Sequence, residues 1–151
     1  MLLAMSMTST KINLSDILSY VIMSYLRKYP LTFFCVIAIW VLCLMKTPST
    51  KLDEIENIDK LYHVMMYFGA CSILWWEYLR RHHKIVWHKI WLFAILFPIA
   101  MGGMIELVQA YFTVYRSGDW GDFFANVVGV MLAVVGGRWG LPQIIHRFFR
   151  K

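Results

Sequence analysis

Apolar residues fall along this chain in long blocks, and not in the alternation that is typical of half-buried strands. Four blocks are candidates for membrane helices, at residues 31–45, 58–79, 90–112 and 122–139. The first block has 15 residues, fewer than the roughly 20 that cross a bilayer. Lys28 and Lys46 flank this block, and their snorkelling side chains can make up the difference. The pattern predicts an all-α fold, an integral membrane four-helix bundle.

A different pattern precedes the first block. Between residues 14 and 26 apolar side chains recur at helical spacing, after Asn13 and Ser15 as candidate N-caps. This segment is too polar to span, so we expect an amphipathic helix that lies in the membrane interface. The sequence LPQIIHRFF, at 141–149, is interpreted as a similar surface segment. The predicted organisation is an interfacial segment at 1–28, a four-helix domain at 29–140 and a basic tail at 141–151.

Composition and charge agree with a membrane protein. Hydrophobic residues make up 60% of the chain and charged residues 16%, with a mean hydropathy of +0.57; an ordinary soluble domain is less apolar. Of the 15 Lys and Arg residues, 11 lie on the side of the two termini and the loop 80–89, and 4 on the other side. The positive-inside rule therefore predicts that both termini are cytoplasmic. The net charge of +6 is a signal of orientation, and no nucleic-acid partner is expected.

Polar residues interrupt the last three blocks at one level, the predicted outer side of the membrane. They are Asp59, Lys60, His63 and Tyr67 in the second block, Glu106 and Gln109 in the third, and Arg116, Asp119, Asp122 and Asn126 before or within the fourth. Asp59, His63 and Tyr67 step by four and therefore share one helix face, as do Asp122 and Asn126. We expect these faces to meet in a polar pocket that opens outward, with the first block packed outside it.

Small residues continue the polar face of the fourth block at Gly129, Ala133 and Gly136. Such a stripe lets helices approach closely in lipid. The contact could lie within one chain or between chains, so the oligomeric state stays open. At the predicted inner level, Glu77 is placed to pair with Arg80 or Arg81, and the nearby tryptophans, Trp75 among them, are typical of an aromatic belt.

Several roles of the polar set remain open from the residues alone. Glu106 and His63 could act as a general acid–base pair, because burial raises the pKa of a carboxyl group and imidazole titrates near neutrality. Lys60 and Arg116 could clamp an anionic head group. The carboxylates and His63 could also hold a divalent metal, but the sequence has no HExxH motif and no cysteine ligands beside them. No metal and no cofactor are therefore predicted. The set could also be structural and only hold the helices together.

Three motifs occur in order and resemble the VanZ-like family of bacterial membrane proteins. They are DKLYHVMMY from Asp59, ELVQ from Glu106 and RSGDWGDFFANVVG from Arg116, and the resemblance covers about residues 57–137. The named member of that family is associated with resistance to glycopeptide antibiotics of the teicoplanin type, and relatives with lipopeptide tolerance. The resemblance implies a role in the cell envelope, at the bacterial cytoplasmic membrane, and specifies no reaction.

These observations lead to one preferred function and two alternatives. We predict a pocket that binds an amphiphilic cell-envelope ligand, which is a lipid-linked precursor, a membrane lipid or a glycopeptide or lipopeptide antibiotic. The predicted ligand-binding residues are Asp59, Lys60, Tyr67, Gln109, Arg116, Asp119, Asp122 and Asn126. The first alternative is a membrane-embedded enzyme that acts on a lipid head group or lipid-linked precursor, with Glu106 and His63 as catalytic residues. The second is a structural or partner-binding subunit.

Overall fold

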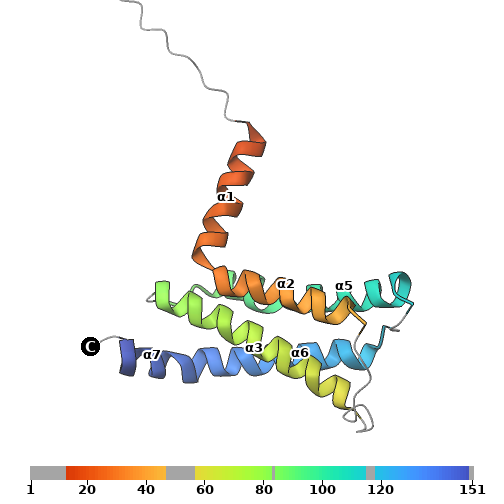
Figure 1. Ribbon diagram of the computed structural model, residues 1–151. Helices are drawn as coiled ribbons and strands as arrows, with labels where there is room; N and C mark the ends of the chain where they lie inside the picture. The colour runs from red at the N-terminus through yellow and green to blue at the C-terminus, as the bar shows by residue number, and fades with distance from the viewer. Residues whose placement is uncertain (1–12, 47–56, 83, 115–117, 150–151) are drawn as a thin grey trace, which may run out of the picture.

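The computed structural model describes residues 13–46, 57–82, 84–114 and 118–149, and these residues form helices without a strand. Four helical rods lie side by side (Figure 1): α2 (Pro30–Leu44), α3 (Ile58–Arg81), α5 (Phe97–Phe112) and α6 (Trp120–Val135). The helix α1 (Leu14–Lys28) projects from one end of this group. The prediction of an all-helical bundle with an N-terminal helix outside it is confirmed.

Two of the rods are longer than the α-helices that name them. The short helix α4 (Trp87–Ile90) and the π-helical turn η2 (Trp91–Leu96) lead directly into α5, and α6 continues through the π-helical turn η3 (Gly136–Gly140) into α7 (Leu141–Phe149). The runs Trp87–Phe112 and Trp120–Ile145 have 26 residues each and are apolar enough to cross a membrane. The helix therefore continues into the segment 141–149, which the sequence indicated as a surface segment, and Ile145 packs into a core cluster with Trp75 and Tyr78.

The helices α1 and α2 meet at a sharp bend of 96° and together form a third candidate span. Tyr29 separates them with a φ of −131°, and Pro30 is the first residue of α2. Proline has no N–H to donate and suits this first position of a helix. None of the side chains of α1 is buried. A helix turned across the end of the bundle is compatible with the predicted interfacial position, which stays a prediction.

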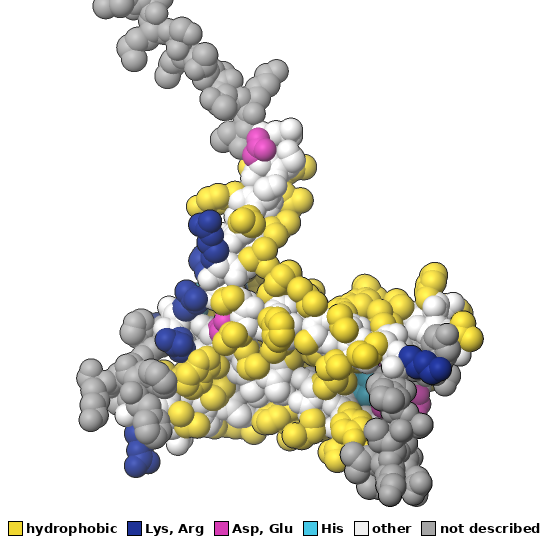
Figure 2. All heavy atoms as spheres, in the orientation of Figure 1, with side chains coloured by type: hydrophobic (Ala, Val, Ile, Leu, Met, Phe, Trp, Pro, Cys, Tyr) yellow, Lys and Arg dark blue, Asp and Glu magenta, His cyan; other side chains and the backbone are white. Residues whose placement is uncertain are grey.

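Charged residues gather at the two ends of the bundle. The acidic end, where α3 and α6 begin and α5 ends, holds Asp59, Glu106, Asp119 and Asp122. The opposite, basic end holds Arg27, Lys28, Arg80, Arg81, Lys89 and Arg138. In Figure 2 most of the visible Lys and Arg side chains lie toward the left, basic end, and the visible His lies at the right, acidic end. The 24 residues of α3, at 1.5 Å each, span about 36 Å and join the two ends.

Glu77 fixes the start of α2 at the basic end. Its carboxylate accepts hydrogen bonds from the backbone N–H of Leu31 at 3.1 Å and of Thr32 at 3.0 Å, and from the Thr32 hydroxyl at 2.7 Å. The first N–H groups of a helix have no partner within the helix, and a carboxylate there also meets the positive end of the helix dipole. Glu77 was expected to pair with Arg80 or Arg81; in the structure both of its oxygens cap the neighbouring helix.

The helices α3 and α6 approach each other closely at the predicted stripe of small residues. A Cβ atom added to Gly129 would lie 2.5 Å from the carbonyl oxygen of Val64 and 3.0 Å from the backbone nitrogen of Phe68. Ala133 is fully buried, and a Cβ on Gly137 would overlap the ring of Trp75. Gly137 thus occupies the place in the stripe that we predicted for Gly136.

We predict that Gly129→Ala destabilises the protein by about 1–3 kcal/mol, because the added methyl group must push the backbones of α3 and α6 apart. Gly69→Ala is the matched control, since a Cβ on this glycine of α3 has nothing within 4 Å. Thermal unfolding of the detergent-solubilised protein measures both. Equal melting temperatures for the two variants would show that the helices do not depend on contact at Gly129.

A second prediction concerns the cap of α2. Glu77→Ala removes the acceptor of three hydrogen bonds, so we expect amide hydrogen exchange at Leu31 and Thr32 to become at least tenfold faster, a loss of about 1–3 kcal/mol of local stability. Exchange at the other end of α2, around Cys43, should change little. Unchanged exchange at Leu31 and Thr32 would contradict the capping role of Glu77.

Candidate functional site

His63 is the centre of the polar cluster at the acidic end. Its side chain is 1% exposed, and its Nδ1 lies 3.0 Å from Oδ1 of Asn126, so a hydrogen bond joins α3 to α6. Asn126 is also fully buried, one turn before Gly129 on α6. Because Nδ1–H donates to the amide oxygen, a neutral imidazole presents the lone pair of Nε2 on its other side. The Nε2 atom lies 3.7 Å from Oδ2 of Asp122.

Lys60 lies one turn before His63 and connects the cluster to the surface. Its Nζ is 3.0 Å from Oδ2 of Asp119 and 3.7 Å from Oδ1 of Asp122. The side chains of Lys60 and Asp119 are 39% and 50% exposed, whereas that of Asp122 is 8% exposed. The cluster therefore has a buried base, made by His63, Asp122 and Asn126, and a rim that solvent reaches.

Asp119 is the N-cap of α6 and holds the rim in place. Its Oδ1 accepts a hydrogen bond of 2.8 Å from the backbone N–H of Gly121, the N-cap contact that favours aspartate at this position. This bond, with Lys60 beside it, lowers the pKa of the Asp119 carboxyl group below its ordinary value. The stabilisation that this carboxylate provides is therefore present at neutral pH and is lost only in acid, as the pH falls through the lowered pKa.

Gly121 was not singled out in the sequence, although it shapes the rim. A Cβ atom at this position would overlap Cε of Lys60, so only glycine lets the lysine side chain lie across the first turn of α6. The signal in the sequence is the spacing of Gly121 between two aspartates in the segment DWGD.

Glu106 connects α5 to the same loop. Its Oε2 accepts a hydrogen bond of 3.1 Å from the backbone N–H of Asp119, and its side chain is buried. Glu106 thus engages the backbone just before α6, whereas His63 engages side chains of α6. The two residues of the expected acid–base pair, Glu106 and His63, lie at the same end of the bundle. Each contacts a different part of the segment that begins at Asp119 and continues into α6.

Tyr67 lies below His63 on α3 and is 1% exposed. A Cβ atom added to Gly102 would come within 3.2 Å of its hydroxyl and 3.0 Å of Nδ2 of Asn126. Neither the Tyr67 hydroxyl nor that amide nitrogen has a hydrogen-bond partner among the described residues. The glycine at position 102 therefore keeps room for two polar groups at the base of the cluster.

Gln109 faces away from the cluster, toward α2. Its Nε2 donates a hydrogen bond of 2.8 Å to the backbone carbonyl of Cys43, and both residues are buried. We expected α2 to pack outside the polar residues. Its backbone instead accepts the hydrogen bond from Gln109, and a backbone acceptor carries no signal in the sequence. Arg116, the other residue expected to hold an anionic group, lies outside the described residues.

Three side chains of the cluster have a geometry that suits a cation. Asp59, His63 and Asp122 each offer one ligand atom, and these atoms lie within 4.8 Å of one another. The hydrogen bond from Nδ1 of His63 to Asn126 resembles the outer-shell contact that orients a metal-bound imidazole. Within the described residues the cluster unites four carboxyl groups, at Asp59, Glu106, Asp119 and Asp122, with one lysine and one histidine.

The exposure of these pairs predicts unequal contributions to stability. Asn126→Ala leaves the buried His63 without its partner, and we expect it to destabilise the protein by about 1–3 kcal/mol. Lys60→Gln breaks an exposed ion pair, and we expect a loss below about 1 kcal/mol. Chemical or thermal unfolding in one detergent measures both variants. A larger loss for Lys60→Gln than for Asn126→Ala would contradict this division into base and rim.

Comparison with known proteins adds one finding. The family model described as VanZ/LLP1 matches residues 1–140. It extends the resemblance found in the three motifs to the N-terminal helix and to α2. No curated protein and no solved structure matches the chain.

Proposed function

The chain belongs to the VanZ/LLP1 family, and we propose that this membrane protein binds the polar end of an amphiphilic cell-envelope molecule at its acidic end. The observation that carries the proposal is the division of the cluster into a buried base and a half-exposed rim. His63 and Asn126 hold the base between two helices, and Lys60 and Asp119 remain accessible above it. A ligand that displaces the water around Lys60 and Asp119 can contact these charged groups without unfolding the bundle.

The charge of the cluster favours a cationic group on the ligand. Four carboxyl groups face one lysine and one histidine within the described part of the site, so an ammonium group gains more from this surface than a phosphate does. The expected ligands are a lipid-linked precursor, a membrane lipid, or a glycopeptide or lipopeptide antibiotic. Binding of such an antibiotic at the membrane would contribute to tolerance.

The proposed orientation follows from the distribution of the basic residues. Eight of the ten Lys and Arg residues that the structure describes lie toward the basic end, so we place this end and both termini on the cytoplasmic side of a bacterial cytoplasmic membrane. The acidic end then faces outward, where envelope precursors and antibiotics are found. An amphiphile in the outer leaflet would place its polar group at the level of Asp119 and Lys60.

A divalent cation is a second candidate, favoured by the arrangement of Asp59, His63 and Asp122. Their ligand atoms lie within 4.8 Å of one another, and carboxylate oxygen with imidazole nitrogen is a common donor set for such ions. A bound cation would neutralise part of the charge of these carboxylates and would allow the site to take an anionic head group instead.

Native mass spectrometry and metal analysis of the protein purified in mild detergent test the proposal. We expect an amphiphile to co-purify with the wild type and to be lost in Asp119→Asn, since asparagine keeps the N-cap but removes the charge. Asp16→Asn, which removes an exposed carboxylate from α1, is the control and should keep the ligand. Identical spectra for the two variants, with both proteins folded, would exclude binding through the rim.

Two further variants separate the alternatives. If the cluster holds a cation, stoichiometric metal should disappear in His63→Asn while the protein stays folded. An enzyme should retain the ligand in Glu106→Gln and fail to convert it. A wild type without ligand or metal, together with unfolding of both variants, would support the structural alternative.

A further inference from the structure

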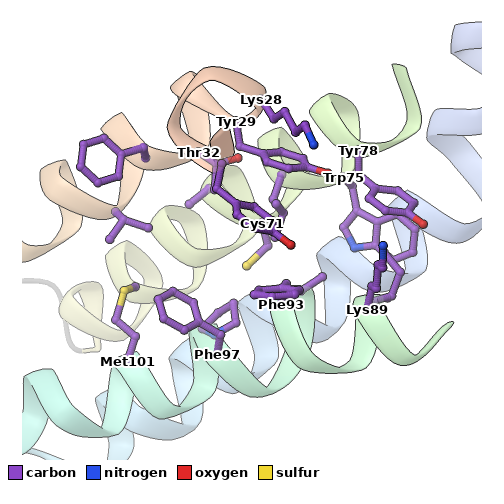
Figure 3. A pocket seen from close by; sticks show the side chains of 18 of the residues that line it. Lys28, Tyr29, Thr32, Cys71, Trp75, Tyr78, Lys89, Phe93, Phe97 and Met101 are labelled. Carbon is purple, nitrogen blue, oxygen red and sulfur yellow. The ribbon is translucent and has the colours of Figure 1, made fainter. Parts of the chain in front are cut away.

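A groove lies in the basic half of the bundle, apart from the acidic cluster. It has a volume of about 580 Å³ and is bounded by α2, α3 and the run from α4 to α5, with the last turns of α1 at its mouth (Figure 3). This volume is in the range of small-molecule sites, about 300–1,000 Å³. Phe93, Phe97 and Met101 step by four along one helical run and form one wall.

Hydrogen bonds at both ends of α2 frame the groove. Glu77 ties the start of α2 to α3, and Gln109 ties its last turn, at Cys43, to α5. The lining of the groove lies between these ties and ends at Ile39 on α2 and Met101 on α5. The groove therefore lies along the part of α2 between its two polar contacts, and its lining stops before the contact of Gln109 with Cys43.

The mouth of the groove is basic. Lys28 and Lys89 extend toward it from opposite sides (Figure 3), and His82 also lines it. None of the described residues that line the groove is acidic. Lysines beside an apolar cavity bury their methylene groups and keep their ammonium groups in water, where they attract the phosphate of an anionic lipid.

A buried donor lies between the basic mouth and the apolar interior. Trp75 is 0% exposed, lines the groove and has no hydrogen-bond partner for its Nε1 among the described residues. In Figure 3 the indole nitrogen is directed to the cavity. A buried N–H without an acceptor is costly, and buried polar groups are normally paired. The side chain was expected in the aromatic belt at the membrane surface, and its burial gives it a different role.

We propose that the groove binds one anionic glycerophospholipid. The groups of such a lipid follow the same order as the residues: phosphate at Lys28 and Lys89, ester carbonyl at the indole N–H of Trp75, and acyl chain along Phe93 to Met101. The last two residues are eight positions apart, or about 12 Å. This is close to the thickness of one leaflet of the hydrocarbon core, about 15 Å.

The site does not depend on the function proposed for the acidic cluster. A lipid held here would fill the space between α2 and α5 and connect α1 to the bundle. The same lipid would bring negative charge to the mouth, between Lys28 and Lys89.

Native mass spectrometry of the full chain in detergent, titrated with phosphatidylglycerol or phosphatidylcholine of the same acyl chains, tests the site. We expect one tightly bound phosphatidylglycerol. Val36→Trp places a large ring in the groove and should abolish binding, whereas Ile37→Trp, on the exposed face of the same turn, should not. Equal binding by these two variants would overturn the proposal.

Two comparisons test the polar contacts. Lys28→Gln with Lys89→Gln should weaken phosphatidylglycerol binding roughly 10- to 30-fold and leave phosphatidylcholine unchanged, since each lysine near anionic lipid is worth about a factor of five. Arg27→Gln with Lys84→Gln removes the same charge from the same end and is the control. Equal weakening by the two pairs would show attraction to net charge only and contradict the site.

An ether-linked phosphatidylglycerol lacks the carbonyl groups that we assign to Trp75. We expect the wild type to bind it about 2- to 10-fold more weakly than the ester-linked lipid, the usual range for one hydrogen bond. Equal affinity for the two lipids would overturn the assignment of the ester group.

Discussion

The architecture depends on the close approach of α3 and α6, which brings the backbone of Val64 against Gly129. One turn away, the same approach sets His63 within hydrogen-bond distance of Asn126. Packing of small residues and hydrogen bonding across the contact are two of the forces that associate helices in lipid. Both act here at one place, so the polar cluster and the packing of the bundle are parts of a single contact.

The second constraint is the attachment of α2 to the bundle, since this helix has only 15 residues and few buried side chains. It is held by two polar contacts, the carboxylate of Glu77 at its start and the amide of Gln109 near its end. Each contact satisfies backbone groups that a short helix in an apolar environment leaves exposed. The two contacts go to different helices, α3 and α5, and the groove is bounded by these helices and α2.

The two sites divide the molecule by charge. The acidic end gathers carboxylates around one lysine, and the basic end gathers lysines and arginines around an apolar cavity. Tyr67 lies between them, since it lines the groove while its hydroxyl faces Gly102 beside Asn126.

By itself the sequence determined the class of the protein, the positions of the helical blocks and the level of the polar residues. Block length and side-chain spacing are properties of a single helix, and they placed Asp59, His63 and Asn126 on faces that do meet. The family followed from three ordered motifs. The stripe of small residues also correctly predicted close packing, except that Gly137 replaces Gly136.

Tertiary structure alone decided which groups pair. Glu77 caps a helix 45 residues away from it at Thr32, although Arg80 and Arg81 are its neighbours in sequence. Gln109 bonds to the carbonyl of Cys43, and Trp75 is buried against Gly137 and not exposed at the interface. Such partners depend on the rotation and separation of whole helices. The backbone groups that receive these contacts carry no side-chain signal, so a pattern of residue types cannot specify their partners.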